Sequence, residues 1–449
     1  MTPHPTYACA SPRPARTAYS TAANMADFSD LPHGVLLKVF IGLTRPINPD
    51  SVRDLCASAS VCPSWREAAK EPSLWRELVV NKAPLNERLT GRRLRNLVAR
   101  SHNTLTRLLL EGCPLVIDTA LARAVQTQPC LVFVNVEDCA RISRHGLAHA
   151  LCDSENFLEI VEQLNDPRQS VADAQRCCVA FKVVLGAEDE EATLAEAQAA
   201  GALHALLRCA ALLAAHAGVQ AACCLALSEY VYAAPDTEVA FLPPIFQAAV
   251  AALKAHPLDM YVQRAALLAL CNACWYGLEG TPGVPALLDA IQHVLAALRA
   301  FPTDLELQEC GCDSLESMCY MDASVAEAVA AAGAMGLFIK VLNLDCTNNN
   351  TLTVAIDAIR VIALSKAALP QASAGIDAVV HALRRHESSK LAVAACRTLG
   401  IYLRSPATRE RAVQAGAEAA IWEAFAEFSN DDDKAVLYAA NYALQDTQA

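Results

Sequence analysis

Cysteine is the residue type whose abundance first suggests chemistry, because the chain of 449 residues contains 19 cysteines. Cysteine thiolates bind metals, and Cys271 and Cys274 have the two-residue spacing of a zinc-binding pair. A structural zinc site needs four ligands, however, and no second pair of this spacing follows. Most other cysteines stand within runs of alanine and leucine, where a free cysteine behaves as a small apolar side chain. The sequence therefore predicts a reducing compartment and no metal site.

The other reactive residue types form no recognisable catalytic arrangement. The sequence has no glycine-rich nucleotide loop, no Gly-x-Ser-x-Gly elbow and no His-Glu-x-x-His pair. The histidines are scattered without ligand spacing, and the acidic runs at 188–191 and 431–433 follow expected helix ends. We therefore predict a protein that is not an enzyme and that carries no cofactor.

The composition favours closely packed helices. Hydrophobic residues make up 54% of the chain and aromatic residues only 6%. Alanine runs recur through the C-terminal two-thirds, and alanine is the best helix former but a poor strand former. The net charge of −12 disfavours nucleic acid, and we interpret the arginines between 88 and 107 as a solvated helix face. No apolar run reaches the roughly 20 residues of a membrane-spanning helix. The sequence thus predicts neither a nucleic-acid partner nor a membrane.

The N-terminal residues 1–26 differ in composition from the rest. They are rich in proline, threonine, serine and alanine, and they carry Arg13 and Arg16. We predict a disordered tail, or sequence upstream of a start at Met25. An organelle transit peptide is the alternative.

Residues 27–80 have the pattern of a small helical unit. Leu31-Pro32 predicts a rigid, extended entry, since proline restricts itself and the preceding residue. Apolar residues from 35 to 43 then fall on one helical face, and a second apolar stripe runs from 55 to 69. Pro72 predicts the end of that helix. A unit of this size is too small to be stable on its own core, so we expect it to pack against something else.

This unit resembles an F-box in the order of Leu-Pro, Phe40, Asp54-Leu55, Val61-Cys62, Trp65 and Leu74-Trp75. The resemblance implies a three-helix unit that docks on a Skp-type adaptor and, through it, joins a cullin-based SCF ubiquitin ligase. Two features depart from the pattern: Gly34 stands where an acidic residue is usual, and the connection between 43 and 54 is long. The alternative is an N-terminal cap of the following repeats. The resemblance implies that the adaptor is bound by Leu31, Pro32, Leu36, Val39, Phe40, Leu55, Val61, Cys62, Trp65, Leu74 and Trp75.

Residues 81–150 contain two similar segments, which start at Leu105 and Leu131. Their period is 26 residues, and it aligns Cys113 with Cys139. This spacing resembles cysteine-type leucine-rich repeats, which implies a short α/β bridge. Two such repeats cannot form an independent horseshoe, because each buries its apolar face only against neighbours. An unrelated strand pair is the alternative.

From residue 155 to 449 the chain repeats about every 44 residues. Helical runs begin at separations of 48, 43, 45, 44, 40 and 44 residues. This period predicts about six to seven armadillo or HEAT units. Ala-Gly pairs precede several runs, at Gly201, Gly333, Gly416 and, more weakly, Gly375. Because glycine tolerates positive φ and close backbone approach, these pairs predict tight corners between helices. The runs begin at Val171, Val219, Val262, Leu307, Thr351, Leu391 and about Ala435.

The corners and the alanine-leucine pattern resemble armadillo repeats more than HEAT repeats. The resemblance implies a mainly all-α protein with a right-handed α-solenoid, whose last helix in each unit lines a concave groove. Of the positions that carry Trp and Asn in nuclear-import receptors, only Asn272 fits, which disfavours that role. Trp275 is predicted to lie either in the groove or in the core. The predicted groove contacts are Glu229, Asn272, Trp275, Asp313, Asp357 and Arg397.

These patterns favour a substrate-recognition subunit of an SCF-type ubiquitin ligase, located in the cytoplasm, the nucleus or both. Such a protein acts by proximity, because it raises the effective concentration of its target near the ligase. The first alternative is a non-degradative armadillo scaffold, in which the N-terminal unit is only a cap. An enzyme that uses the cysteine-rich helices is a more distant one.

Overall fold

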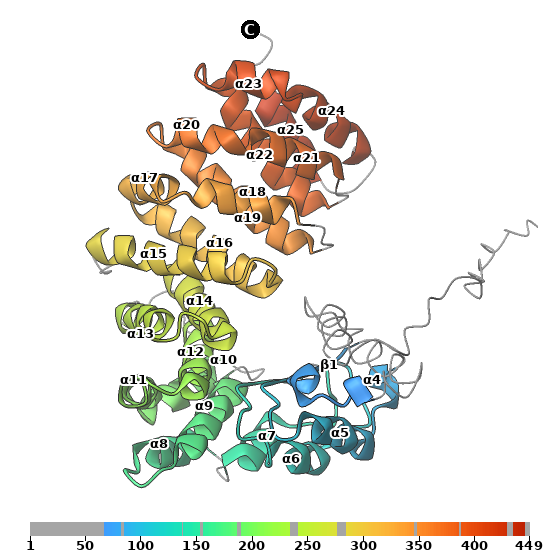
Figure 1. The fold of residues 1–449 in the computed structure, drawn as a ribbon, viewed down its shortest axis with the longest axis vertical. Helices are drawn as coiled ribbons and strands as arrows, with labels where there is room; N and C mark the ends of the chain where they lie inside the picture. The colour runs from blue at the N-terminus through green and yellow to red at the C-terminus, as the bar shows by residue number, and fades with distance from the viewer. Residues whose placement is uncertain are drawn as a thin grey trace, which may run out of the picture.

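The computed structural model describes residues 67–81, 85–136, 138–152, 156–185, 190–233, 241–275, 284–344, 348–385, 388–428 and 434–444. These residues form a small three-stranded sheet beside a tall stack of helices (Figure 1). One continuous apolar core runs through both parts. The predicted all-α class with a solenoid-like body is therefore confirmed.

The sheet is parallel, in the order β1 (Glu77–Val80), β2 (Arg107–Leu110) and β3 (Phe133–Asn135). Its register places Phe133 opposite Arg107, so that β2 and β3 pair residues 26 positions apart, which is the period found in the sequence. Short helices precede, connect and follow the strands. They are η2 (Pro72–Trp75), α4 (Leu85–Arg88), α5 (Gly91–Val98), η3 (Ala99–Ser101), α6 (Asp118–Val125) and α7 (Arg144–Cys152).

The two aligned cysteines make equivalent hydrogen bonds at the ends of the strands. Cys113 Sγ donates to the carbonyl oxygen of Val80 at 3.6 Å, and Cys139 Sγ donates to that of Leu110 at 3.3 Å. Val80 and Leu110 each end a strand, and both cysteines are buried. A buried backbone carbonyl needs a donor, so each thiol satisfies the end of the preceding strand. The two units are thus equivalent in structure, while their membership of the leucine-rich repeat family stays a prediction.

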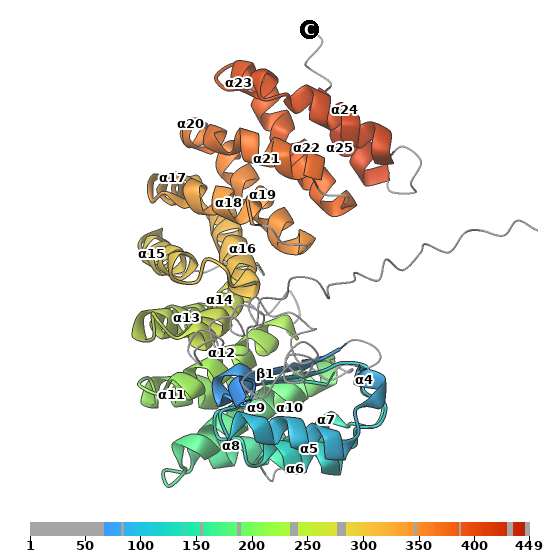
Figure 2. The same cartoon turned by 45° about the vertical axis from the view of Figure 1, so that its right-hand side comes forward.

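The stack of helices follows, from α8 near the sheet to α25 near the C-terminus (Figure 1 and Figure 2). Seven long helices pack on one another in series and form its spine: α9, α12, α14, α16, α19, α22 and α25, which we call the ladder helices. Their bounds are Val171–Leu185, Ala217–Tyr232, Met260–Trp275, Leu305–Met321, Asn349–Leu364, Ser389–Arg404 and Lys434–Leu444.

The remaining helices cover the ladder helices. Figure 1 shows several of them, such as α13 and α15, stacked along one side of the body. They are α8 (Phe157–Asn165), α10 (Glu190–Ala199), α11 (Ala202–Leu212), α13 (Leu242–Ala255), α15 (Val284–Ala300), α17 (Ala323–Ala331), α18 (Ala334–Leu342), α20 (Leu369–Ala372), η4 (Ser373–Gly375), α21 (Ile376–Arg385), α23 (Arg409–Gln414) and α24 (Ala417–Glu427). Among the described residues no single helix is long and apolar enough to cross a membrane; by length and composition only the pair α17 and α18, bent by 76°, passes that test together.

A buried glutamine joins each of three ladder helices to the helix before it. Gln263 Nε2 donates to the carbonyl oxygens of Leu253 and His256, both at 3.0 Å. Gln220 and Gln308 make the same two bonds, to carbonyls ten and seven positions earlier in the chain. The carbonyls at a helix C-terminus have no partner within their own helix. Each side-chain amide therefore supplies a donor to the carbonyl ten positions earlier, and a second donor to the carbonyl seven positions earlier, which also accepts from a backbone N–H. We call these three residues the glutamine braces.

Three of the four predicted glycine corners are confirmed. Gly201, Gly333 and Gly416 have φ values of 75°, 82° and 79° and precede α11, α18 and α24 directly. Gly375 differs, because it ends the 3-10 helix η4 and has no positive φ. A Cβ on Gly375 would lie 3.2 Å from Met335 Cε, so close packing explains that glycine.

The sheet is tied to the middle of the helical stack by a group of charged residues. Arg107 donates to the two carboxylate oxygens of Glu306 at 2.7 and 3.3 Å. Arg264 donates to Asp304 at 3.0 Å and pairs with Glu306 at 3.2 Å, while Glu77 lies 3.7 Å from Arg107 and 3.9 Å from Arg264. Although burial opposes ionisation, the two arginines hold the pKa of Glu306 below its usual value. We call these five residues the charged junction; Glu77, Arg264, Asp304 and Glu306 border a cavity of about 550 Å³.

Candidate partner-binding surface

Two of the predicted adaptor contacts lie in the described part of the chain, and both are in the protein's own core. Leu74 and Trp75 are 6% and 1% exposed. Trp75 Nε1 donates to the carbonyl oxygen of Ala69 at 2.7 Å, and the Arg100 guanidinium lies 4.8 Å from its ring centre. These two side chains anchor the segment internally, and their contact with an adaptor stays a prediction. The other nine lie outside the described residues: Leu31, Pro32, Leu36, Val39, Phe40, Leu55, Val61, Cys62 and Trp65.

The predicted groove contacts lie on one stripe of the ladder helices. Each of these helices is buried on most sides by its neighbours, and the stripe is its incompletely buried part. Asn272 Nδ2 donates to the buried Ser228 Oγ at 2.9 Å, and the buried Cys271 Sγ donates to Asp313 at 3.2 Å, so these bonds join neighbouring ladder helices. The structure places Glu229, Asn272, Trp275, Asp313, Asp357 and Arg397 on the incompletely buried stripes of α12, α14, α16, α19 and α22. We call these stripes together the ladder stripe.

The first ladder helices also contact the sheet. Lys182 of α9 pairs with Glu229 of α12 at 3.0 Å. The same ammonium group lies 4.9 Å from the ring centre of Phe133 in β3. The guanidinium carbon of Arg107 lies 4.8 Å from the same ring centre. A cation over an aromatic ring is attracted by the negative face of the ring. Buried and half-buried side chains thus connect β2 and β3 to α9 and α12.

The middle of the ladder stripe is acidic. Asp313 and the buried Glu316 of α16 lie near Asp357 of α19, and Glu309 lies one turn earlier in α16. Among the described residues, Arg360 is the cation that pairs with Glu316 and Asp357. Burial, with the nearby Asp357 charge, raises the pKa of Glu316 to about 8. Burial also raises the pKa of Asp313 and of Glu309. These shifts mean that negative charge is poorly compensated here, because solvation is lost and the carboxyls repel one another.

Large, exposed, mainly apolar side chains stand at the C-terminal ends of four successive ladder helices. Tyr232, Trp275, Tyr320 and Leu364 are 58%, 65%, 56% and 56% exposed. They occupy the last or next-to-last position of α12, α14, α16 and α19, at spacings of 43, 45 and 44 residues. The exposure of Trp275 resolves its two alternatives in favour of the surface. Sequence reasoning missed the other three, although they share the repeat position of Trp275. We call these four residues the terminal apolar row.

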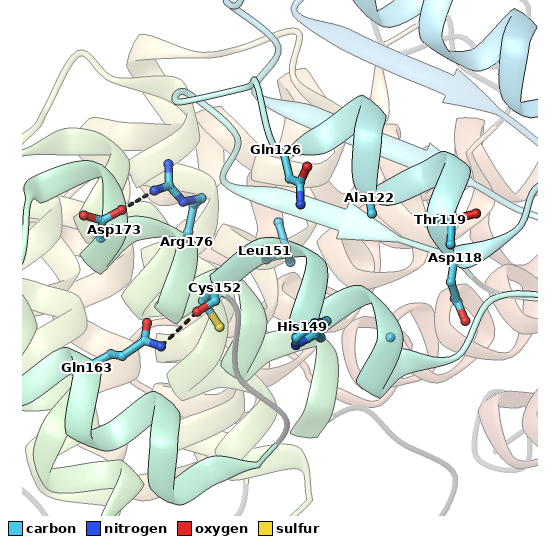
Figure 3. A pocket seen from close by; sticks show the side chains of 11 residues that line it. Asp118, Thr119, Ala122, Gln126, His149, Leu151, Cys152, Gln163, Asp173 and Arg176 are labelled. Atoms are coloured by element: carbon cyan, nitrogen blue, oxygen red, sulfur yellow. Dashed lines mark hydrogen bonds and ion pairs between the residues drawn. The ribbon is translucent and has the colours of Figure 1, made fainter.

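A separate cavity of about 650 Å³ lies between α6, α7 and α9 (Figure 3). Several of the polar groups that line it form hydrogen bonds or ion pairs within the protein. Gln163 Nε2 donates to the carbonyl oxygen of Cys152 at 2.9 Å, Asp173 pairs with Arg176, and Asp118 accepts from the backbone of Ser143 at 2.8 Å. The first of these bonds connects α8 (Phe157–Asn165) to α7, the second lies within α9, and the third connects α6 to the residue before α7.

The cysteines that lie close together in the structure are not the Cys271 and Cys274 pair noted in the sequence. Cys271 and Cys274 are buried, and burial raises the pKa of both thiols, as expected for apolar packing. The buried thiols of Cys178, Cys209 and Cys223, from α9, α11 and α12, all lie within 4.8 Å of one another. This group offers three ligands where structural zinc takes four. Its members stand far apart in the sequence, so no spacing rule could have found it.

Comparisons with known proteins bear on the N-terminal part. The F-box-like family model matches residues 28–81, a segment that ends just after β1. The chain is 31% identical over 103 residues to F-box protein At3g27290 of Arabidopsis thaliana, which is 23% of this chain and 27% of that protein. It is 29% identical over 102 residues to F-box protein SKIP14 of the same plant, which is 22% of each chain. The chain thus spans about a quarter of the length of the curated relatives it matches.

Solved structures of two engineered proteins are similar over the helical body. One covers 66% of this chain and 99% of its own, with 18% identity and a TM-score of 0.39. The other covers 65% and 96%, with 16% identity and the same TM-score. The informative likeness is therefore the N-terminal one: residues 28–81 are an F-box-like domain, in a chain with weak similarity to plant F-box proteins.

Proposed function

We propose that the protein is a substrate-recognition subunit of an SCF-type ubiquitin ligase. The F-box-like match at residues 28–81 carries this proposal, because F-box domains in general bind a Skp-type adaptor. The adaptor in turn brings a cullin. The helical body holds a protein target, and the chain itself performs no chemistry. Its contribution is to keep target and ligase together, which raises their effective concentration.

The charged junction supports these separate roles of the F-box-like segment and the helical body. Glu77 lies in β1, within the segment that matches the F-box-like family. It faces Arg107 of β2 and Arg264 of α14, and both arginines reach Glu306 at the start of α16. Arg107, Arg264 and Glu77 are largely buried, and Glu306 is half-buried. Such largely buried charges hold a definite geometry, since an unpaired member would be costly. The end of the matched segment therefore has a fixed position relative to the ladder helices.

The test is complex formation with an adaptor. The full chain is co-expressed with a Skp-type adaptor, and the complex is measured by size-exclusion chromatography with light scattering. We expect a 1:1 complex. We expect it to be lost when Leu31 and Pro32 are both replaced by alanine, with circular dichroism showing that the helical body remains folded.

Trp275→Ala provides the matched control, because this exposed side chain lies on the ladder stripe, outside the F-box-like segment. It should leave the adaptor complex intact. If the unmodified chain forms no complex, the receptor role is wrong. A complex that persists in the folded Leu31→Ala, Pro32→Ala variant would mean that the F-box-like segment is not the docking surface. The repeat scaffold would then be the better description.

A further inference from the structure

We propose that the buried thiols of Cys178, Cys209 and Cys223 form a binding site for a trivalent thiophilic ion such as arsenic(III). One sulfur comes from each of α9, α11 and α12, so a bound ion would link three helices. We call these three residues the cysteine trio. The site stands independently of the proposed function, because it rests on the positions of the sulfurs and on their surroundings.

The distances within the cysteine trio are those of ligands that share one central ion. The three sulfur atoms all lie within 4.8 Å of one another, and Cys178 Sγ lies 3.3 Å from Cys223 Sγ. A bond from a thiolate to a metal ion is about 2.3 Å long, so two sulfurs on one ion lie at most about 4.6 Å apart. Small side-chain rotations therefore bring all three sulfurs onto one centre. In the part of the chain that the structure describes, no other three cysteine, histidine or carboxylate side chains converge in this way.

The backbone around the cysteine trio is held by bonds that do not involve the sulfurs. Gln220, one turn before Cys223 in α12, donates to the carbonyl oxygen of Ala210 at 2.7 Å. Ala210 directly follows Cys209 in α11, so this brace fixes α11 against α12 beside two of the three ligands. The α12 helix also packs on α9. The sulfurs are therefore preorganised, which lowers the cost of binding an ion.

The surroundings of the cysteine trio determine which ion fits. Among the residues three or four positions from each cysteine, Lys182 alone carries a charge. Its ammonium group already pairs with Glu229 at 3.0 Å. Buried apolar side chains such as Phe181, Leu206 and Leu227 occupy other positions of this set. Because an uncompensated charge in apolar surroundings is costly, the favoured complex is one without net charge.

A trivalent ion meets this condition when it binds three thiolates. The three negative charges of the thiolates cancel its charge, whereas a zinc complex keeps one negative charge and a copper(I) complex keeps two. Copper(I) and zinc both prefer soft thiolate ligands, so their charge is what disfavours them in this site. Zinc also needs a fourth ligand, which the cysteine trio does not supply. Arsenic(III) takes three sulfur ligands and forms a neutral complex.

Binding is an exchange of ligands in which no atom changes its oxidation state. Arsenite in water is arsenous acid, which carries three hydroxyl groups on arsenic. Three arsenic–sulfur bonds replace the three arsenic–oxygen bonds, and each hydroxyl group leaves as water with the proton of one thiol. Arsenic stays trivalent, so the reaction needs no oxidant or reductant.

Cys209 is the sulfur that an ion from solvent reaches first. Its side chain is 5% exposed, whereas Cys178 and Cys223 are both 0% exposed. It lies on α11, one of the covering helices on one side of the body (Figure 1). Hydrogen bonds from the thiols of Cys178 and Cys223 lower the pKa of Cys209, although burial acts in the opposite direction. Because the thiolate is the nucleophile, Cys209 makes the first bond and the two buried thiols follow.

The experiment titrates the full chain with sodium arsenite and measures the complex by native mass spectrometry. A phosphine keeps the thiols reduced, since a dithiol reductant would itself bind arsenic. We expect the first arsenic to add the mass of one arsenic atom less three hydrogen atoms, because all three ligands lose their protons. A site made of two thiols would instead retain a hydroxyl group on arsenic. Hydrogen exchange of the backbone amides should become slower in α9, α11 and α12 of the complex.

Two variants assign the site, with circular dichroism showing that each is folded. Cys209→Ala and Cys178→Ala each leave two thiols, and each should weaken arsenite binding at least about a hundredfold, since even the loss of a residue that only supports a metal ligand costs about 10–100-fold. Cys396→Ala is the matched control, because Cys396 is equally buried but belongs to α22. It should bind arsenite as tightly as the unmodified chain.

Three results would overturn the inference. Failure of the unmodified chain to bind arsenite would mean that the three thiols only fill space in the core. A first arsenic that retains a hydroxyl group, or equal binding by the two site variants and the control, would place the bound arsenic on other cysteines. Displacement of arsenic from the cysteine trio by an equal concentration of zinc or copper(I) would contradict the charge argument.

Discussion

Gln263 illustrates how much one side chain can contribute to a repeat. It is 1% exposed, and its amide satisfies two carbonyls at the end of α13. Glutamine on a helix is usually exposed, so a periodicity analysis treats it as a surface residue. The signal was nevertheless in the sequence, because Gln220, Gln263 and Gln308 all stand second in their helical runs. Recognising it required the structure, since nothing local says which carbonyls a buried amide will reach.

We expect Gln263→Leu to lower the free energy of unfolding by about 1–3 kcal/mol. The replacement keeps the volume similar but leaves the Leu253 carbonyl without a donor, while the His256 carbonyl keeps its bond from the Asp259 backbone N–H. Chemical denaturation followed by circular dichroism would measure the change. Gln247→Leu on α13 is the matched control, because Gln247 is exposed, and it should cost less than about 0.5 kcal/mol. Equal effects of the two changes would show that the amide bonds are unimportant.

Glu316 makes the stability of the protein depend on pH. Its pKa in the folded protein is about 8, raised from 4.5 by burial and by Asp357, while Arg360 acts in the opposite direction. The folded state therefore binds this proton more tightly than the unfolded state does. The resulting stability is present below about pH 4.5 and is lost as the pH rises through about 8. Asp313 also faces this carboxyl and adds repulsion when it is ionised.

We expect the unmodified protein to lose more stability than Glu316→Gln between pH 5 and pH 8.5. The difference should be at least about 1.4 kcal/mol, which corresponds to one pKa unit. Urea unfolding of both proteins at the two pH values would measure it. Glu327→Gln, on the exposed face of α17, should behave like the unmodified protein. Identical pH slopes for Glu316→Gln and the unmodified protein would contradict the shifted pKa.

At the scale of elements, the 44-residue period located the ladder helices closely. Six of the seven begin one or two residues before the predicted run, for instance α14 at Met260 rather than Val262. The difference arises because the first turn of a helix is partly exposed, so its apolar stripe starts later than its backbone. The corners at Gly201, Gly333 and Gly416 were also predicted correctly. Gly375 was not, because an Ala-Gly pair does not distinguish a left-handed corner from close packing.

Gly333 and Gly336 allow the corner to be tested with the same chemical change. Neither glycine has a neighbour within 4 Å of a built Cβ, but Gly333 has a φ of 82° whereas Gly336 lies inside α18. We expect Gly333→Ala to destabilise the protein by about 1–2 kcal/mol through left-handed strain. Gly336→Ala should stabilise it by up to about 1 kcal/mol, since alanine is the better helix former. Thermal unfolding would report both, and equal signs would refute the assignment.

At the scale of the whole molecule, the charged junction is the feature that sequence reasoning could not reach. Arg107 and Glu306 are 199 positions apart. Both sit in segments whose local patterns, a strand and a helix start, say nothing about each other. The sequence divided the chain into an N-terminal unit, a bridge and a solenoid, and it gave no sign that the bridge contacts the solenoid at its middle. For the candidate surface, sequence reasoning identified the residues of the ladder stripe. It missed three of the four members of the terminal apolar row.

The junction can be tested by charge reversal. We expect Arg107→Glu to destabilise the protein by about 1–3 kcal/mol, because the new carboxylate would face Glu77 and Glu306. Adding Glu306→Arg should recover part of the loss, with a coupling free energy of about 0.5–3 kcal/mol in a double-mutant cycle. Small-angle scattering of the single variant should show a less compact particle. Additive effects and unchanged scattering would mean that the apolar core alone holds the sheet in place.

The glutamine braces also have a consequence for how the molecule comes apart. The equivalent positions in α19, α22 and α25 are Leu352, Ala392 and Val436, none of which can donate a hydrogen bond from its side chain. In a linear array, each unit exchanges contact energy only with its neighbours. The array should therefore unfold stepwise from its C-terminal end. Amide protons there should exchange with solvent before those of α12 to α16.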